Sequence, residues 1–329
     1  MKTLKTLALG IACSCALMGC EKPSKITINP NKETYNVGVC QITQHPALDA
    51  ATNGFEAKLT EELAARGRKV NVNIQNASGD NSLCTTIVNS FISQKYDLIL
   101  GNATPALQAA FTATSTIPVL GTSITDYGKA TGLPMTDGKS GTNISGTSDL
   151  AKISDQVDLM LSLLKDKEIN KVGVLSCSAE ANSAFQVREV TKALNAKGKE
   201  VVSKTFSETA DLTAVCASLL DCDAVYLPTD NTLASNTAII KANITDKGVP
   251  IFAGEEGICA GCGFATLSID YYRLGEITGK MAAEILVGEK DIREYEIQYD
   301  SNPTKKYNKA ICEQLGLLDV ITEDFEEIK

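Results

Sequence analysis

Residues 96–108 read YDLILGNATPALQ and contain a strand pattern followed directly by a helix pattern. The run from Leu98 to Leu100 is apolar at every position, which is typical of a strand buried on both faces of a parallel sheet. Directly after it, Thr104 and Pro105 begin a helical pattern, with proline in the first turn, where its missing N–H costs nothing. A buried strand that leads straight into a helix is the repeating unit of an α/β fold.

The same alternation of apolar strands and helical patterns runs along the chain from Tyr35 to about Val287. The strand-like runs are rich in β-branched residues, and the helical patterns carry apolar residues at steps of three or four. We expect strands at residues 35–42, 69–77, 96–103, 116–123, 171–178, 199–206, 222–230 and 249–256. We expect helices at residues 47–65, 83–93, 105–114, 182–197, 211–220, 231–247 and 271–287.

An irregular, glycine-rich stretch at residues 129–149 separates two such series, so the sequence predicts two α/β lobes with parallel sheets. A strand-like segment at residues 293–300 and a helix at 305–315 come after the long helix at 271–287. The run GFATLSID at residues 263–270, the long helix and the strand-like segment form a βαβ unit after a completed series. This unit is expected to return to the first half, which makes both lobes discontinuous. The predicted lobes are residues 35–148 with 263–292, and residues 149–262 with 293–329.

The N-terminus has the pattern of a secretory signal peptide over residues 1–20, with Lys2 and Lys5 before a short apolar run. The run is too short to span a bilayer as a stable helix. It ends in LMGC, which resembles the bacterial lipobox, so we expect cleavage before Cys20 and lipid modification of that cysteine. An ordinary secretory cleavage beside an incidental cysteine is the alternative. Residues 21–34 are polar and contain two prolines, and they are expected to form a flexible tether.

The charge of the chain argues against a nucleic-acid partner. The formal net charge is −9, and removal of the signal peptide with its two lysines moves it to −11. No second long apolar run is present to make a transmembrane helix. We therefore expect an exported body that faces the periplasm or the cell exterior and is held to the membrane by lipid.

Eight cysteines follow Cys20, and several of them lie in apolar strand patterns, where a free thiol packs as a small hydrophobic group. Exported chains normally oxidise their thiols, so one or two disulfides of unknown pairing are also expected. Cys259 and Cys262 have the two-residue spacing of redox and zinc pairs. They are predicted to form a local disulfide or to pack as thiols, and an exported redox or metal protein is the alternative function.

Polar loops follow most of the expected strands, at the edge of a parallel sheet where ligands collect. In Gln44-His45-Pro46 and in Ala103-Thr104-Pro105, a proline begins a helix whose free N–H groups and partial positive charge suit a carboxylate. The hydroxyl of Thr104 either adds a hydrogen bond to the ligand or only caps its helix.

Acidic residues also gather in these loops, where a carboxylate is able to pair with the ammonium group of a ligand. Such a charge-assisted hydrogen bond is worth about 1.5–3 kcal/mol. An exposed loop position or a helix cap is the alternative role of each acid. The candidates are Asp49, Asp126, Asp149, Asp230, Glu255, Glu256 and Asp270.

The sequence gives little support to catalysis. His45 is the only histidine, so an H-E-x-x-H zinc motif cannot occur. The sequence also lacks the G-x-S-x-G elbow of hydrolases, the Walker A motif and a glycine-rich dinucleotide motif. A hydrolase that uses two loop carboxylates stays open as an alternative. We expect no catalytic residue, no metal and no cofactor.

Taken together, the loops resemble those of a known family. Runs that look like QHPALDAA, QNASGD, ATPALQAA, TSITD, SGTSD, SAEANS, FAGEEG and IDYYRLGEITGKMAAEIL occur, in this order, in substrate-binding lipoproteins of ABC importers. The resemblance is to the family associated with tryptophan, tyrosine and phenylalanine uptake. It covers the chain from Tyr35 to about Gly316.

The resemblance implies a type I periplasmic-binding-protein fold, with two Rossmann-like lobes joined by three crossing segments and an amino-acid-like ligand, aromatic in this family, between them. It implies capture and delivery to an ABC permease and ATPase, without catalysis. Thr104 and the amides near it are implied at the ligand carboxylate, and Asp126, Asp230 or Glu255 at its ammonium. The candidate ligand-binding residues are Gln44, His45, Asp49, Thr104, Pro105, Ala106, Thr125, Asp126, Ser148, Asp149, Asn182, Ser183, Asp230 and Glu255.

Two features depart from the family pattern close to the expected cleft. Tyr127 stands where relatives usually have proline, and it either stacks on an aromatic ligand or covers the loop. The Cys259–Cys262 segment is also unusual. Both departures leave the identity of the ligand open.

Overall fold

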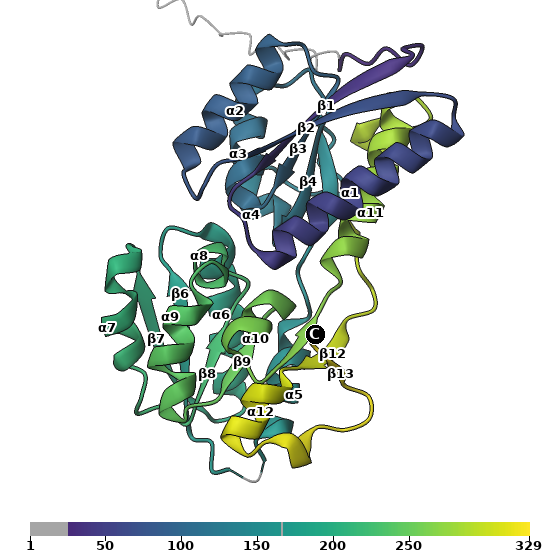
Figure 1. Ribbon diagram of the computed structural model, residues 1–329. Coiled ribbons are helices and arrows are strands. Elements are labelled where there is room, and N and C mark those ends of the chain that lie inside the picture. The colour runs from purple at the N-terminus through teal and green to yellow at the C-terminus, as the bar shows by residue number, and fades with distance from the viewer. Residues whose placement is uncertain (1–25, 166) are drawn as a thin grey trace, which may run out of the picture.

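The computed structural model describes residues 26–165 and 167–329, which form two lobes with one β-sheet each (Figure 1). The first sheet has the strand order β11-β5-β4-β3-β1-β2 and is parallel throughout. Its strands are β1 (Thr34–Gln41), β2 (Lys69–Asn76), β3 (Leu98–Asn102), β4 (Val119–Ile124), β5 (Ile144–Ser148) and β11 (Gln298–Tyr299).

The second sheet has the order β13-β12-β10-β9-β8-β6-β7, and only the β10–β12 pair is antiparallel. Its strands are β6 (Lys171–Cys177), β7 (Glu200–Phe206), β8 (Ala224–Leu227), β9 (Ile251–Ala253), β10 (Ala265–Ser268), β12 (Thr304–Tyr307) and β13 (Glu326–Glu327). The predicted α/β fold with two mainly parallel sheets is confirmed.

Helices cover both faces of the first sheet, as its apolar strands require. Along β1, Val37 and Val39 pack in the core that α1 and α11 share, whereas Cys40 packs in the core formed with α2 and α3. The helices of this lobe are α1 (Pro46–Ala65), α2 (Asn81–Ser93), α3 (Thr104–Ala113), α4 (Tyr127–Thr131) and α11 (Tyr271–Leu286). Those of the second lobe are α5 (Ile153–Leu163), α6 (Ala181–Ala196), α7 (Leu212–Ala217), α8 (Asn231–Ala234), α9 (Thr237–Asn243), α10 (Glu256–Cys262) and α12 (Lys309–Leu315).

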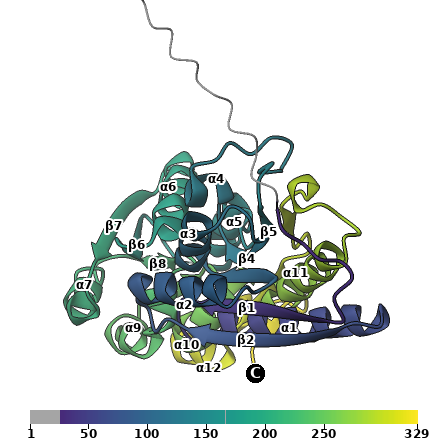
Figure 2. The ribbon, with the colours of Figure 1, turned by 90° about the horizontal axis from the view of Figure 1, so that it is seen from above.

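The late helix α11 lies against α1, so the chain does return to the first lobe (Figures 1 and 2). Glycines bring the two backbones close together. A Cβ atom at Gly275 would lie 2.0 Å from the carbonyl oxygen of Ala51, and one at Gly54 would lie 2.0 Å from that of Tyr272. The pairing of these two helices therefore depends on residues without side chains.

The chain crosses between the lobes three times, at residues 149–152, 269–270 and 300–303. The boundaries expected at 263 and 293 differ from these positions. Residues 265–268 pair with β9 because their apolar run completes the second sheet, and Gln298–Tyr299 pair with Thr147–Ser148 in the first sheet. Both lobes are discontinuous, with crossings a few residues later than the sequence indicated.

Three expected elements differ in detail. The helix expected at 231–247 is divided into α8, α9 and a 3₁₀ turn at Thr245–Lys247. The segment expected to be helical from 305 forms β12 before α12 begins at Lys309. Residues 256–262, expected in a glycine-rich connection, form α10, because Glu255 caps this helix by accepting hydrogen bonds from the N–H groups of Gly257 and Ile258.

The tether expected at residues 21–34 is shorter than the sequence indicated. Ile26 and Ile28 pack against the core of the first lobe, and the N–H of Thr27 donates to the carbonyl of Thr116. Lys32 also pairs with Asp97 at 2.7 Å. A few apolar residues thus attach this polar segment to the lobe, while Cys20 and the predicted signal peptide lie outside the described residues.

Candidate functional site

A cavity lies between the two lobes and is lined by side chains of both. In the present arrangement of the lobes its volume is only about 20 Å³, close to the room of one water molecule, so a larger ligand requires the lobes to move apart. The first lobe and the crossing segments supply His45, Leu48, Ser123, Asp149 and Tyr271, and the second lobe supplies Asn182, Thr229, Asp230, Asn231, Ala234 and Glu255. Most of these residues follow the carboxyl ends of strands, as expected for a ligand site in parallel α/β sheets.

His45 forms the entry to α1 in the wall contributed by the first lobe. Its backbone is extended, Pro46 occupies the first turn, and no side chain caps the helix. The free N–H groups at this end of a 20-residue helix therefore carry a partial positive charge close to the cavity. His45 itself is 8% exposed, and its Nδ1 atom has no hydrogen-bond partner among the described residues.

The backbone is strained where two neighbouring strands of the first lobe end. Ala103 after β3 has a φ of +81°, and Ser123 in β4 has a φ of +58°. Residues other than glycine rarely adopt such positive φ values. Between Gly121 and Ile124, the pairing of β4 with β5 also shifts register. Ser123 lines the cavity at this bulge, and its hydroxyl is buried without a partner among the described residues.

Asp149 lies at the first crossing and is buried on the floor of the cavity. It accepts hydrogen bonds from the hydroxyls of Thr125 at 3.0 Å and Tyr271 at 3.1 Å. Burial raises the pKa of this carboxyl to about 6, against the lowering effect of the two hydroxyls. None of the described residues that line the cavity is a lysine or an arginine, so the negative charge has no cation beside it.

Two further buried acids face the cavity from the second lobe, and each caps a helix. Asp230 caps α8 and accepts from the N–H groups of Cys177 and Leu233 and from the Ser183 hydroxyl. Burial, together with the nearby charge of Glu180, raises its pKa. Burial also raises the pKa of Glu255, to about 7. The cavity thus contains three carboxyl groups that are costly to ionise without a cationic partner.

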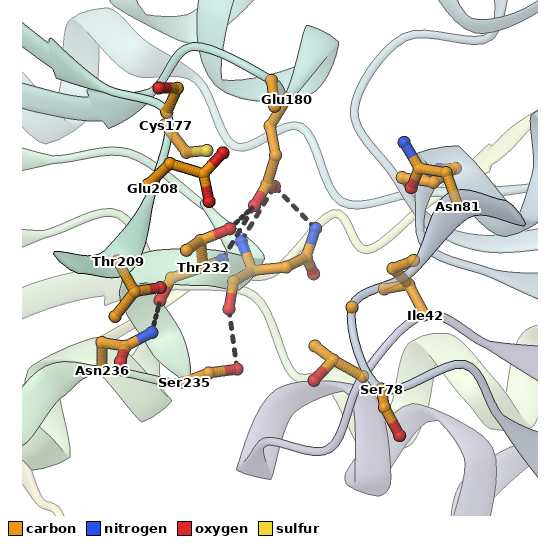
Figure 3. A pocket seen from close by; sticks show the side chains of 16 residues that line it. Ile42, Ser78, Asn81, Cys177, Glu180, Glu208, Thr209, Thr232, Ser235 and Asn236 are labelled. Carbon is orange, nitrogen blue, oxygen red and sulfur yellow. Dashed lines mark hydrogen bonds between the residues drawn. The ribbon is translucent and has the colours of Figure 1, made fainter. Parts of the chain in front are cut away.

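The carboxylate of Glu180 forms a hydrogen-bond network at the edge of the cavity. It accepts from the backbone and side chain of both Thr232 and Asn231, at 2.7–2.9 Å (Figure 3). It also accepts from the side chain of Asn182 at 3.1 Å. A larger opening lies on the outer side of this network and is lined by Glu180, Glu208 and Asn81, among others (Figure 3). The network therefore borders both the inner cavity and this opening, here called the outer compartment, and Asn231 lines the two of them.

Direct hydrogen bonds join the lobes around the cavity. Nε2 of His45 lies 3.2 Å from Oδ1 of Asn231, and the side-chain amide of Gln186 donates to the Thr125 hydroxyl at 3.1 Å. Both pairs are formed by residues of opposite lobes. The lobes are therefore in contact across the mouth of the cavity.

Five of the predicted residues line the cavity itself: His45, Asp149, Asn182, Asp230 and Glu255. Thr125 and Ser183 are one hydrogen bond away, through Asp149 and Asp230, and Ser148 donates to the carbonyl of Thr125. Pro105 lines the outer compartment. Thr104 and Ala106 are buried at the start of α3, Asp49 accepts from the Gln41 side chain, and Gln44 is exposed.

Asp126 and Tyr127 have structural partners outside the cavity. Asp126 caps α4 by accepting from the N–H of Lys129, and it is half-buried. The hydroxyl of Tyr127 donates to the carbonyls of Gly121 and Thr147 inside the first lobe, and its ring is buried. Of the two roles open to Tyr127, covering the loop is the one that its contacts favour.

Four residues important to the site were not predicted. Ser123 lies within an expected strand, and a positive φ cannot be read from one sequence. Asn231, Tyr271 and Glu180 belong to loops or helix starts that were recognised, but a polar residue there is indistinguishable from a cap. SAEANS and PTDNT, the motifs that contain Glu180 and Asn231, were the available signals.

The eight cysteines of the described residues are all buried and free. Burial raises the pKa of Cys259 and Cys262 in α10, which disfavours the thiolate that redox and metal chemistry require. Over residues 26–165 and 167–329 no group of three or more acidic, histidine or cysteine side chains is placed to hold a metal ion. In the same residues no helix has the length and apolar character needed to span a bilayer.

The two discontinuous lobes and the cavity between them define a protein of the type I periplasmic-binding class. The chain belongs to the family of ABC transporter substrate-binding proteins, whose model it matches over residues 36–324. It is similar to a tyrosine-binding protein of Clostridioides difficile, with 34% identity over 294 residues, which are 87% of this chain and 84% of the relative.

Two solved structures show how the lobes are arranged. A domain from Streptococcus pneumoniae in complex with L-Trp has 28% identity and a TM-score of 0.83 over 90% of this chain and 100% of its own. A ligand-free, open substrate-binding protein with adhesive properties from Clostridium difficile has 33% identity but a TM-score of only 0.67. The match covers 90% of this chain and 99% of that protein's chain. The lobes of this chain are thus arranged more like those of the L-Trp complex.

Proposed function

We propose that the protein is a lipid-anchored receptor that captures an aromatic amino acid in the cavity between its lobes and delivers it to an ABC permease and ATPase. The observation that carries the proposal is the interlobe cavity, with its three buried carboxyl groups and its unpartnered polar atoms. Two similar proteins are described with tyrosine or L-Trp as ligand, which supports the aromatic class.

The ammonium group of the ligand is the partner that the cavity lacks. Asp149, Asp230 and Glu255 are buried in a space whose described lining includes neither lysine nor arginine. A buried charge without a partner is costly, and one cation in the cavity offsets that cost. Charge-assisted hydrogen bonds to the ammonium would contribute about 1.5–3 kcal/mol each.

The carboxylate of the ligand is proposed to lie at the free helix N-termini of the first lobe. Neither α1 nor α3 has a side-chain cap, and each has proline in its first turn. Their unbonded N–H groups and partial positive charges suit an anion. Thr104 and Ala106 at the start of α3 stay proposed contacts of the carboxylate, and they do not line the inner cavity in the present arrangement. The side chain of His45 is not part of this carboxylate site.

Capture would occur by closure of the lobes. The residue pairs His45–Asn231 and Thr125–Gln186 join the lobes in the present arrangement. A ligand that contacts both walls stabilises only the closed form, because the two walls meet the ligand only there. Binding therefore shifts the population toward the closed form. Binding without chemical change is the activity that follows, and Cys20 would hold the closed receptor near its permease.

Thermal unfolding with a panel of amino acids tests the proposal. A ligand at one hundred times its dissociation constant adds about 2.7 kcal/mol to the free energy of unfolding. We expect L-tyrosine, L-tryptophan or L-phenylalanine to raise the melting temperature, and the corresponding aromatic propionates, which lack the amine, to have little effect. An absence of response to all three amino acids would refute the ligand class.

A further inference from the structure

The single histidine is held between the lobes with one ring nitrogen bonded and one free. Nε2 of His45 lies 3.2 Å from Oδ1 of Asn231, which belongs to the other lobe. Nδ1 is buried and has no partner among the described residues, and His45 is one of the residues that line the cavity. The hydrogen-bonding character of Nδ1 therefore depends on which nitrogen carries the proton.

Glu180 determines, through Asn231, whether Nδ1 of His45 donates or accepts a hydrogen bond. Its carboxylate accepts from Nδ2 of Asn231 at 2.8 Å, so the amide nitrogen faces Glu180 and the amide oxygen faces His45. The opposite orientation would place an oxygen against the carboxylate, which is repulsive. A carbonyl oxygen only accepts, so Nε2 must be the donor, and Nδ1 of the neutral ring becomes an acceptor.

The same carboxylate orients a second amide on the opposite wall. Nδ2 of Asn182 donates to Glu180 at 3.1 Å and to the carbonyl of Thr229 at 3.0 Å. This leaves Oδ1 of Asn182 buried and without a partner among the described residues. One carboxylate thus fixes the orientation of two buried acceptors, one on each lobe, in residues that line the same cavity.

We propose that Glu180 is a positioning residue that fixes His45 as the Nε2–H tautomer, so that His45 Nδ1 and Asn182 Oδ1 accept hydrogen bonds from the ammonium group of the ligand. The ligand part of this inference rests on the proposed function. A primary ammonium is the matching group, because it carries three donors and no acceptor, whereas an indole N–H or a phenol offers one donor. Glu180 itself points to the helix cap and does not contact the ligand.

The charged groups around His45 are consistent with a neutral ring. Burial lowers the pKa of His45, and this effect outweighs the raising effects of the Asn231 hydrogen bond and of the Glu180 and Asp49 charges. Asp149, Asp230 and Glu255 line the same cavity. A pKa below the ordinary value of 6.5 leaves the imidazole uncharged at pH 7, as a single tautomer requires.

Nitrogen NMR of the histidine-labelled protein tests this directly, because the chain contains one histidine and the spectrum needs no assignment. In the wild type at pH 7, we expect the Nε2–H tautomer without ligand. Addition of L-tyrosine or L-tryptophan should shift the Nδ1 signal without protonating the ring. An Nδ1–H tautomer or a charged ring in the wild type would overturn the inference, and this result does not depend on any variant.

Glu180→Gln is the perturbing variant, with the exposed Glu208→Gln as its matched control at the outer compartment. In E180Q the Asn231 amide is free to turn, so we expect a mixture of tautomers and about tenfold weaker binding of the amino acid. The matching aromatic propionate, which lacks the ammonium, should bind E180Q and the wild type equally. E208Q should behave as the wild type in both measurements.

The outcomes separate the two proposals. An unchanged tautomer in a folded E180Q, or an equal loss of affinity for the amino acid and the propionate, would overturn the role of Glu180. If aromatic amino acids alter neither NMR signal nor stability, the proposed function fails, and the ligand contact fails with it. The tautomer of the free protein then still decides whether Glu180 positions His45.

Discussion

Replacement of Asp149 by asparagine should change stability and ligand affinity in opposite directions. Asp149 is 6% exposed, and burial raises its pKa from 3.8 to about 6. Between these values the folded state binds more protons than the unfolded state, so the free energy of unfolding falls as pH rises through this window. A difference of about two pKa units corresponds to about 3 kcal/mol of cost at pH 7.

The D149N substitution would remove that cost while keeping most of the geometry. One of the two hydroxyl bonds, from Thr125 or Tyr271, would be weakened, at a loss of about 0.5–1.5 kcal/mol. The ligand-free D149N protein should therefore be about 1.5–2.5 kcal/mol more stable than the wild type at pH 7, with a smaller decline in stability between pH 4 and 6. Its affinity for the amino acid should fall about tenfold to a hundredfold, because the ammonium loses a charged partner.

Urea unfolding without ligand and calorimetric titration with L-tyrosine and L-tryptophan measure the two effects. Asp80→Asn is the control, since Asp80 caps α2 on the exposed surface and asparagine caps equally well. D80N should change neither quantity. If D149N binds as tightly as the wild type, Asp149 is not the partner of the ammonium. If D149N is also less stable without ligand, the reasoning from burial is wrong.

Four further outcomes are expected. Gln186→Leu should weaken binding several-fold, measured by calorimetry, because the closed form loses its bond to Thr125; unchanged affinity would contradict this. Gly275→Ala should lower the free energy of unfolding by about 3 kcal/mol or more in urea, since its Cβ atom meets the α1 backbone; a stable variant would contradict the close packing. Cys20→Ser should move the protein from the membrane fraction to the soluble exported fraction, and retention would argue against lipidation. Cys259 and Cys262 should react with a thiol reagent only after denaturation, and rapid reaction in the native protein would contradict their burial.

Most of the architecture could be predicted from the sequence because the strands are apolar on both faces. Runs such as residues 96–103 imply a sheet covered by helices on each side, and the return of α11 to the first lobe followed from its place after a completed series. The exact crossings could not be predicted. A two-residue strand such as β11 has no periodicity of its own, and its partner in β5 lies about 150 residues earlier.

The candidate site was predictable where a polar side chain follows a strand. This rule found His45, Asp149 and Glu255, but it also selected Asp126, which caps a helix beside the site. Ser123 could not be found, because its place in the cavity depends on a bulge and a positive φ. The role of Glu180 depends on the orientation of two amides, which is a property of the folded network alone.

The proposed function requires that the cavity between the lobes holds an amino acid by its ammonium group. A crystal structure of the protein grown with L-tyrosine or L-tryptophan tests it most directly. We expect the amino acid in the inner cavity, with its ammonium nitrogen within hydrogen-bonding distance of Asp149, of Nδ1 of His45 and of Oδ1 of Asn182. An amino acid whose carboxylate meets these groups, or one bound only in the outer compartment, would contradict it.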